Sequence, residues 1–373
     1  MRTAVVILNW NTRDYLGRFL PPLLESLQGL DAGVVVADNA SDDGSRELLA
    51  ELFPQVRTIL LEENFGFTGG YNRAFAELLQ EENAPEYLVL LNSDIEVAPG
   101  WLEPLVAWMD AHPDYAACGP KLHALVPEGD GWRRTDRFEY AGAAGGLLDR
   151  YGFPFCRGRV LKRTERDEGQ YDRPKDVLWV SGACLLVRAR AWQQLGGLDA
   201  RFFAHMEEID WCWRAQLAGW RVGVVPDSCV WHLGGGTLAP ASPFKLKLNY
   251  RNGLLLLENN LPATIGARQA RRRIRMRNIL DCAAAIVYLL SGKGACARAV
   301  RDAHREYRQL RGEPGTEKAA SVPGEEKTAL PGTKKATGVP GNVKGLWDVR
   351  ILLQAALRGE KIFNYLRRYE DSH

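Results

Sequence analysis

Short apolar runs alternate with longer amphipathic stretches over the first 120 residues. The apolar runs predict buried strands at Ala4–Leu8, Val34–Ala37, Arg57–Leu61 and Tyr87–Leu91. The amphipathic stretches have helical spacing at Tyr15–Leu27, Ser45–Phe53, Asn72–Glu81 and Trp101–Ala111. This alternation predicts an α/β fold with a mainly parallel sheet that helices cover on both faces. Pro21-Pro22 inside the first helix predicts a kink or a split there.

The rest of the chain has a less regular pattern. Residues 121–176 give no clear element, whereas strands are predicted at Val177–Val180, Ala183–Val187 and Arg221–Val225 and a helix at Glu207–Ala218. We therefore expect one catalytic-type α/β domain over residues 1–243 and a helical, basic extension over 244–312. Repeated Pro-Gly dipeptides among Lys, Glu, Thr and Ala predict a low-complexity linker over 313–343. An amphipathic C-terminal helix is expected within 344–373.

Composition narrows the class of protein. The net charge of +2 gives no overall argument for nucleic acid as a partner. The seven cysteines are scattered without a Cys-x-x-Cys pair, which disfavours a zinc site or a disulfide framework and suits a reducing cytoplasm. No extended apolar segment resembles a signal peptide or a membrane span. We expect a cytoplasmic protein, either soluble or peripheral on the inner face of the plasma membrane.

The triplet Asn92-Ser93-Asp94 follows directly on an apolar run. Ligands of open α/β sheets collect at the carboxyl ends of strands, where Asp94 can offer a carboxylate to a divalent cation, with Asn92 as a neutral companion. Mg²⁺ often uses one or two carboxylates plus substrate phosphates, so a single Asp is sufficient. Taken alone, the triplet is explained better as a turn, and its place among other motifs favours the metal interpretation.

Two further segments have the pattern of a nucleotide pocket. Asp38 ends the second predicted strand, where its carboxylate can accept hydrogen bonds from a base or a ribose; the loop after it also fits helix capping. The segment Asn64–Asn72 contains Gly66, Gly69 and Gly70, which permit close approach of a ligand near a helix start. Its spacing matches neither a Walker loop nor a dinucleotide fingerprint, so this pattern is weak alone.

Acidic residues gather at the start of the predicted helix 207–218. On a helix Glu207 and Asp210 share a face, and Glu208 points sideways from the first turn. Acidic residues in a first turn also fit the helix dipole, but neighbouring aromatic residues predict an environment that raises a carboxyl pKa. His232 follows a predicted strand and precedes glycines, so it is either a packing residue or a ligand.

Taken together and in this order, these motifs resemble the family 2 glycosyltransferases of the GT-A fold. The likeness is closest to the bacterial branch that contains rhamnosyltransferases of cell-surface polysaccharide assembly. It is carried by Val5–Asn11, Val36–Ser45, Asn64–Asn72, Leu90–Asp94, Val180–Ala183, Gly196–Glu208 with Asp210 and Arg214, Val230–Gly236 and Asn249–Asn252. The resemblance implies a Rossmann-like GT-A catalytic domain with a mostly parallel central sheet, followed by a C-terminal helical extension.

The resemblance also implies roles for individual residues. Asn92 and Asp94 match the metal motif, with Asp94 binding Mg²⁺ or Mn²⁺ and the donor diphosphate, and His232 matches a histidine that completes the metal site in some members. The general base belongs to the pair Glu207-Glu208, with Asp210 as a helper; the second acid is Glu here rather than the commoner Asp. The positions that match the donor pocket are Asn9, Asn11, Asp38, Asn64, Gly66, Gly69, Gly70 and Asn72.

The implied reaction is an inverting transfer of a sugar, with rhamnose as one candidate. The donor would be a nucleoside-diphosphate sugar of the dTDP or UDP type, and the acceptor a hydroxyl of a glycan or a lipid-linked molecule in cell-surface polysaccharide synthesis. A nucleotidyltransferase acting on a sugar phosphate is an alternative, disfavoured because no Walker-type Lys or basic Gly-rich loop follows the first strand. A non-catalytic nucleotide-sugar binding module is a second alternative. It is disfavoured because the presence of Asp94, Glu208 and His232 in these motifs would then be a coincidence.

Six arginines lie within residues 268–277, next to the apolar stretch Ile279–Leu290. Two interpretations stay open: a solvated helix face, or a surface for anionic lipid head groups that would suit a lipid-linked acceptor. In the second, residues 346–369 would also lie on the membrane. Nucleic acid is not expected as a partner, because no aromatic residues are interleaved with the basic ones.

Overall fold

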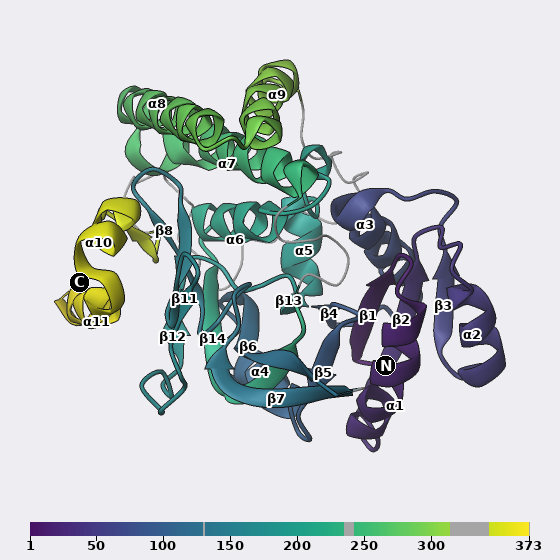
Figure 1. Ribbon diagram of the computed structural model, residues 1–373. Coiled ribbons are helices and arrows are strands. Elements are labelled where there is room, and N and C mark those ends of the chain that lie inside the picture. The colour runs from purple at the N-terminus through teal and green to yellow at the C-terminus, as the bar shows by residue number, and fades with distance from the viewer. Residues whose placement is uncertain (130, 235–241, 314–342, 373) are drawn as a thin grey trace.

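A ten-stranded mixed sheet forms the centre of the protein. The structure, a computed structural model, describes residues 1–129, 131–234, 242–313 and 343–372 (Figure 1). The sheet runs in the order β12-β14-β6-β13-β4-β1-β2-β3, with β5 paired to β14 and β7 paired to β6. Its strands are β1 (Thr3–Asn9), β2 (Ala32–Asp38), β3 (Arg57–Leu60), β4 (Tyr87–Leu91), β5 (Ile95–Val97), β6 (Tyr115–Glu128), β7 (Gly131–Phe138), β12 (Lys175–Asp176), β13 (Cys184–Arg188) and β14 (Arg221–His232).

The predicted apolar runs form the parallel part of this sheet. Strand β1 pairs in parallel with β2 and β4, and β2 pairs in parallel with β3. Strand β13 is antiparallel to β4 and β6, so the sheet is parallel only in part. Along β1, Ala4 and Val6 enter one hydrophobic core while Val5 and Ile7 enter the other. A strand that is buried on both faces in this way needs a continuous apolar sequence.

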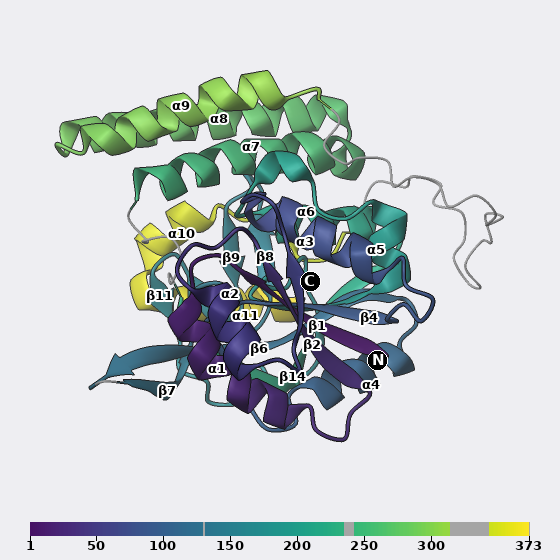
Figure 2. The same ribbon diagram turned by 90° about the vertical axis from the view of Figure 1, so that its right-hand side faces the viewer.

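Helices cover both faces of the sheet (Figure 2). One core contains residues of α1 (Arg13–Ser26), α2 (Ser45–Leu52) and α4 (Leu102–Ala111). The other core contains residues of α3 (Gly66–Leu78), α5 (Ala189–Leu195), α6 (Glu207–Leu217) and α7 (Pro243–Ile265). Helix α1 is a single element through Pro21 and Pro22, so the predicted split is wrong. Both prolines lie on its exposed side, where water can bond the carbonyl groups that lose a donor.

Residues 121–176, for which the sequence predicts no element, form short paired strands. Beyond β6 and β7 these strands are β8 (Gly146–Asp149), β9 (Pro154–Cys156), β10 (Arg159–Val160) and β11 (Arg163–Thr164). The predicted strand Val177–Val180 is buried but lies outside the assigned strands. Its backbone N–H groups at Val177 and Leu178 bond to Val222 and Gly146 respectively. This segment therefore bridges two sheets instead of extending one.

The C-terminal segment packs into the body of the protein. Strand β15 (Leu346–Trp347) pairs in parallel with β8 and completes a second sheet, ordered β11-β10-β9-β8-β15. Helices α10 (Ile351–Arg358) and α11 (Ile362–Ser372) bury Ile351, Ile362 and Phe363 in a core shared with β8 and β9. Where the sequence predicts one amphipathic helix, the structure has a strand and two helices. The Pro-Gly segment lies almost entirely outside the described residues.

Helices α8 (Ala267–Leu290) and α9 (Gly294–Leu310) form an outer layer over α7 (Figures 1 and 2). Much of α8 faces away from the protein, since its buried residues are Ala270, Arg277 and Asp281. Within the described part of the chain, no helix combines the length and the hydrophobicity that crossing a membrane requires.

Replacing Ile362 by Ala should lower the free energy of unfolding by about 2–5 kcal/mol, the usual cost of truncating a buried Ile. Ile362 has no exposed surface, whereas Leu357 on α10 is 72% exposed. The matched variant Leu357→Ala should therefore change stability by less than about 0.5 kcal/mol. Urea denaturation of both variants gives the measurement, and equal small effects would contradict the docking of α11.

Candidate functional site

Asp38, at the end of β2, is a fully buried carboxylate that the surrounding loops hold in place. It accepts hydrogen bonds from Asn9 Nδ2 at 2.8 Å, Arg46 Nε at 2.6 Å and the Ser41 backbone N–H at 3.0 Å. Burial by itself raises the pKa of Asp38, but the bonds from Ser41, Arg46 and Asn9 outweigh it and lower the pKa below its ordinary value. The carboxylate therefore stays ionised and fixes the two loops at this sheet edge.

Asn11 joins the same two loops by a reciprocal pair of bonds. Its Nδ2 donates to Asp42 Oδ1 at 2.7 Å, and the Asp42 backbone N–H donates to Asn11 Oδ1 at 2.9 Å. Its backbone has a φ of +55°, a left-handed conformation that Asn tolerates better than most residues. Asn11 therefore shapes this sheet edge.

The glycine-rich segment is mostly helical, because α3 begins at Gly66. A Cβ atom on Gly66 would lie 2.5 Å from the ring of Phe203, and its φ is +69°. A Cβ on Gly69 or Gly70 would come within 2.8 Å or 2.5 Å of a neighbouring side chain. Close packing within the chain accounts for all three glycines. Binding of a donor by this segment stays a prediction.

Asn64 and Asn72, both predicted in the donor pocket, use their amide groups within the chain. Asn64 Oδ1 accepts from Asn39 Nδ2 and from the Gly66 N–H, each at 2.9 Å. Asn72 exchanges two bonds with the backbone of Leu198, at 2.8 Å and 2.9 Å. These contacts tie α3 to β2 and to the segment that precedes α6.

Asn92, Asp94 and His232 come together in the structure. Strand β5, which begins just after Asp94, pairs with the end of β14, so that His232 lies opposite Ile95. His232 Nε2 lies 3.2 Å from Asp94 Oδ1 and 3.4 Å from Asn92 Nδ2. Both Asp94 and His232 are almost fully buried.

Glu139 is a site residue that the sequence did not reveal. Its Oε2 lies 3.3 Å from His232 Nδ1, so the imidazole is placed between Glu139 and Asp94. Burial by itself lowers the pKa of His232, but the two carboxylates outweigh it and raise the pKa well above its ordinary value. Glu139 follows β7, within the stretch for which no element is predicted, and no local pattern marks it.

Glu207 and Glu208 begin α6 as an acidic pair, in which Glu207 is buried and Glu208 is partly buried. Oε2 of each is buried and has no hydrogen-bond partner among the described residues. Burial raises the pKa of Glu208 to about 7, and burial together with the charge of Glu208 raises the pKa of Glu207 well above its ordinary value. A carboxyl with a pKa near neutrality is suited to general base catalysis.

Gly182 and Ala183 lie between the acidic pair and the Asn92 triplet and contact both. The Asn92 backbone N–H donates to the carbonyl of Ala183 at 2.9 Å. Gly182, the residue before Ala183, lies beside the acidic pair. A Cβ atom on Gly182 would lie 3.6 Å from Glu208 Cβ and 3.3 Å from the ring of Phe67. The start of α6 and the end of β4 therefore line the same region.

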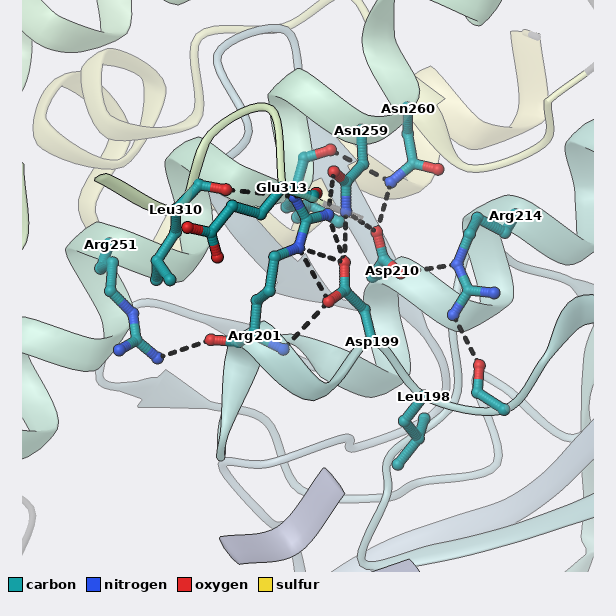
Figure 3. A network of polar contacts seen from close by, with 12 residues as sticks. Leu198, Asp199, Arg201, Asp210, Arg214, Arg251, Asn259, Asn260, Leu310 and Glu313 are labelled. Carbon is teal, nitrogen blue, oxygen red and sulfur yellow. Dashed lines mark hydrogen bonds and ion pairs between the residues drawn. The ribbon is translucent and has the colours of Figure 1, made fainter. Parts of the chain in front are cut away.

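Asp210 lies outside this region, in contrast to its predicted role as a helper of the base. It is fully buried and accepts hydrogen bonds from Arg214 Nε at 2.7 Å, Asn259 Nδ2 at 2.9 Å and Asn260 Nδ2 at 2.8 Å (Figure 3). Its carboxylate is directed to α7, and it joins the two helices.

The described side chains do not form a complete metal site. No group of three or more His, Cys, Asp and Glu in this part of the chain is arranged to hold a metal ion. Asp94 and His232 offer two ligands at most, which fits a cation that takes its other ligands from substrate phosphates and water. Because a ligating imidazole is neutral, His232 would have to lose a proton to bind such an ion.

A mixed sheet with acidic residues at the ends of β2 and β4, and an acidic pair at the start of α6, is the arrangement expected of a glycosyltransferase of the GT-A fold. The sequence pattern of glycosyl transferase family 2 matches residues 4–191, and the chain belongs to that family. The predicted fold class and enzyme class are thereby confirmed. The protein is 29% identical over 234 residues to the N-acetylglucosaminyl-diphospho-decaprenol L-rhamnosyltransferase of Mycobacterium tuberculosis, covering 61% of this chain and 75% of the relative.

Other known proteins are consistent with this assignment. The dTDP-rhamnosyl transferase RfbF of Shigella flexneri is 23% identical over 262 residues, covering 67% of this chain and 79% of the relative. The predicted likeness to rhamnosyltransferases is therefore confirmed. A crystal structure of GalNAc-T7 with UDP, GalNAc and Mn²⁺ matches with a TM-score of 0.53 and 20% identity, over 68% of this chain and 47% of that one. This match supports the fold.

Glu208→Gln should stabilise the protein increasingly as the pH rises from about 5 to about 8. The native state holds the Glu208 proton more tightly than the unfolded chain, because its pKa is about 7 instead of the ordinary 4.5. Ionisation therefore costs native stability as the pH rises, and Gln removes that cost. Thermal unfolding at several pH values tests this, with the exposed Glu62→Gln as control; a constant difference across pH would contradict the raised pKa.

Proposed function

We propose that the protein transfers a sugar from a nucleoside-diphosphate donor of the dTDP or UDP type to a hydroxyl of a glycan or lipid-linked acceptor, with inversion. Rhamnose is the sugar that the names of the relatives favour, in cell-surface polysaccharide synthesis. The observation that carries the proposal is the Glu207-Glu208 pair, with its raised pKa values and its buried Oε2 atoms, near the Asn92–Asp94 triplet.

In this reaction Glu208 is the general base. Its carboxylate accepts the proton of the acceptor hydroxyl while the hydroxyl oxygen forms a bond to the anomeric carbon of the donor. The bond from that carbon to the phosphate oxygen breaks in the same step, and a single displacement of this kind inverts the configuration. Burial keeps the proton affinity of Glu208 high, and the charge of Glu208 together with burial raises the pKa of its neighbour Glu207.

Asp94 is the residue proposed to hold the donor diphosphate through Mg²⁺ or Mn²⁺. A bound divalent cation would neutralise charge on the departing diphosphate. His232 Nε2 points to Asp94 and is the second proposed ligand, and Glu139 at its Nδ1 would fix the orientation of the ring. The predicted contacts of Asn9, Asn11 and Asp38 with the donor nucleotide remain part of this proposal.

Attachment to an anionic membrane is a second part of the proposal. Helix α8 exposes Arg268, Arg271, Arg272 and Arg275 in its first half and Ile279, Ile286, Val287, Leu289 and Leu290 in its second. At about 100° per residue these positions fall on one side of the helix. The other two arginines are engaged within the protein: Arg277 is buried and pairs with Asp281, and Arg273 pairs with Asp348. The apolar residues buried by α10 and α11 are not available for a membrane.

Substitutions at Glu208 and Asp94 should affect different steps. Glu208→Gln should keep donor binding and reduce turnover roughly 10²- to 10⁴-fold, the usual contribution of a general base. Asp94→Asn should lose metal-dependent donor binding. The measurements are diphosphate release and donor-dependent thermal shift with a panel of dTDP-, UDP- and GDP-sugars and Mn²⁺ or Mg²⁺.

Unchanged donor affinity in Asp94→Asn, with metal present, would reject the role of Asp94. A loss of turnover in Glu207→Gln but not in Glu208→Gln would exchange the roles of the pair. Release of pyrophosphate from a nucleoside triphosphate would favour the nucleotidyltransferase alternative instead.

Charge and apolarity of the exposed α8 face should both be needed for membrane binding. Native protein should float with liposomes that contain anionic lipid, and less with neutral ones. The variants Arg271→Glu/Arg275→Glu and Ile286→Ser/Leu290→Ser should each reduce flotation. The control is Leu52→Ser/Leu60→Ser, which changes leucines of similar exposure outside the outer layer of α8 and α9. This variant should bind liposomes as the native protein does. Failure of the native protein to bind either liposome would remove this part of the proposal.

A further inference from the structure

The four residues before Glu207 form a turn in an unfavourable backbone conformation. Phe203, His205 and Met206 have φ values of +63°, +71° and +74°. Residues with a side chain rarely adopt this left-handed region, and they keep it only where the surroundings impose it. Because Met206 directly precedes α6, this turn determines where the helix begins and how the acidic pair is presented.

Helix α7 holds this turn in place through Asn252. The two N–H bonds of the Asn252 amide are shared among the carbonyl oxygens of Phe202 at 3.0 Å, Ala204 at 2.8 Å and His205 at 2.7 Å. Asn252 has no exposed surface, so water does not compete for these bonds. One side chain therefore bonds to backbone on both sides of the strained Phe203.

Arg251 supports the same segment. Its Nη2 donates to the carbonyl of Phe202 at 2.7 Å, and its Nε donates to Asn252 Oδ1 at 2.9 Å, which orients the Asn252 amide. Glu306 on α9 pairs with Arg251 Nη1 at 3.3 Å. The Asn252 amide is thus oriented by Arg251, which α9 holds in turn.

On its other side the turn rests against α3. The Thr68 N–H donates to the carbonyl of Phe203 at 3.2 Å, and the ring of Phe203 occupies the space that a Cβ atom on Gly66 would need. The turn is therefore held between two helices that are far apart in the sequence, α3 and α7.

We propose that Asn252 is a positioning residue for the general base: it imposes the left-handed turn at Phe203–Met206 and thereby fixes the place of Glu208 in the site. Arg251 acts through Asn252 by orienting its amide. This inference rests on the proposed function, in which Glu208 accepts the acceptor proton. It gives Arg251 and Asn252 of α7 a positioning role for the base, although this helix lies outside the sheet.

Asn252→Ala should lower kcat roughly 10- to 100-fold, since a base displaced by about 1 Å loses on this order. Donor affinity should change less than about twofold, because the loops after β1, β2 and β4 are untouched. A looser turn admits water to Glu208, so the acidic limb of the pH–kcat profile should move to lower pH. Thr264→Val is the matched control: Thr264 is a buried residue of α7 that bonds Trp213 on α6 at 2.9 Å, away from the turn. It should leave the pH profile unchanged.

Arg251→Lys is the second variant, should Asn252→Ala fail to fold. It keeps a charge for Glu306, loses the planar guanidinium that bonds both Phe202 and Asn252, and should shift the pH profile in the same direction. A folded Asn252→Ala, or else Arg251→Lys, with native kcat and pH profile overturns the inference. Glu208→Gln distinguishes a failure of this inference from a failure of the proposed function, because native turnover in that variant would reject Glu208 as the base.

Discussion

The geometry of the site depends on one buried carboxylate, that of Asp210. Arg214 from the same helix, and Asn259 and Asn260 from α7, all donate to it. Removing the partners of a buried charge costs about 3–5 kcal/mol, so α6 and α7 are strongly held together at this point. Because α6 begins with Glu207 and Glu208, the same contact fixes the acidic pair relative to the rest of the protein.

The contacts around Asp210 extend to the end of α9 (Figure 3). Asn259 Nδ2 also donates to Asp199, which pairs with Arg201, and Arg201 Nη1 donates to the carbonyl of Glu313 at 2.8 Å. Charged groups of the segment before α6 and of α6 are thus satisfied by one another, by amide groups of α7 and by a backbone carbonyl just after α9. The helices after residue 243 support the catalytic region as well as covering it.

Sequence patterns are sufficient to predict the parts of this protein whose structure depends on neighbouring residues in the chain. The run Tyr87–Leu91 predicts a central strand because a strand buried on both faces is apolar throughout. The meeting of Asp94 with His232 is also predicted, from the resemblance to the family. Glu139 is not foreseen as part of the site, because contacts far along the chain bring it there and no spacing marks it. Asn252 lies in a segment that carries the family resemblance, but the resemblance implies no role for it.

The glycine-rich segment shows the opposite limit: a pattern typical of ligand binding that packing within the chain explains. Gly66 and Gly70 have the composition of a ligand-binding loop, yet each is required by the side chain of a residue remote in the sequence, Phe203 or Leu8. Asp210 likewise has the spacing of a catalytic helper and is used in helix packing. Residue type and spacing do not distinguish a polar group that meets substrate from one that meets another helix.

The pairing of β8 with β15 has a consequence for how the chain folds during synthesis. Leu148 of β8 pairs with Leu346 of β15, which is synthesised almost two hundred residues later. At about 5–20 residues per second, a ribosome takes roughly 10–40 s to make that stretch. Throughout that interval β8 presents an open edge, of the kind that pairs readily with other chains. In the nascent protein this edge therefore lacks its partner until the C-terminal strand emerges, which favours aggregation over that interval.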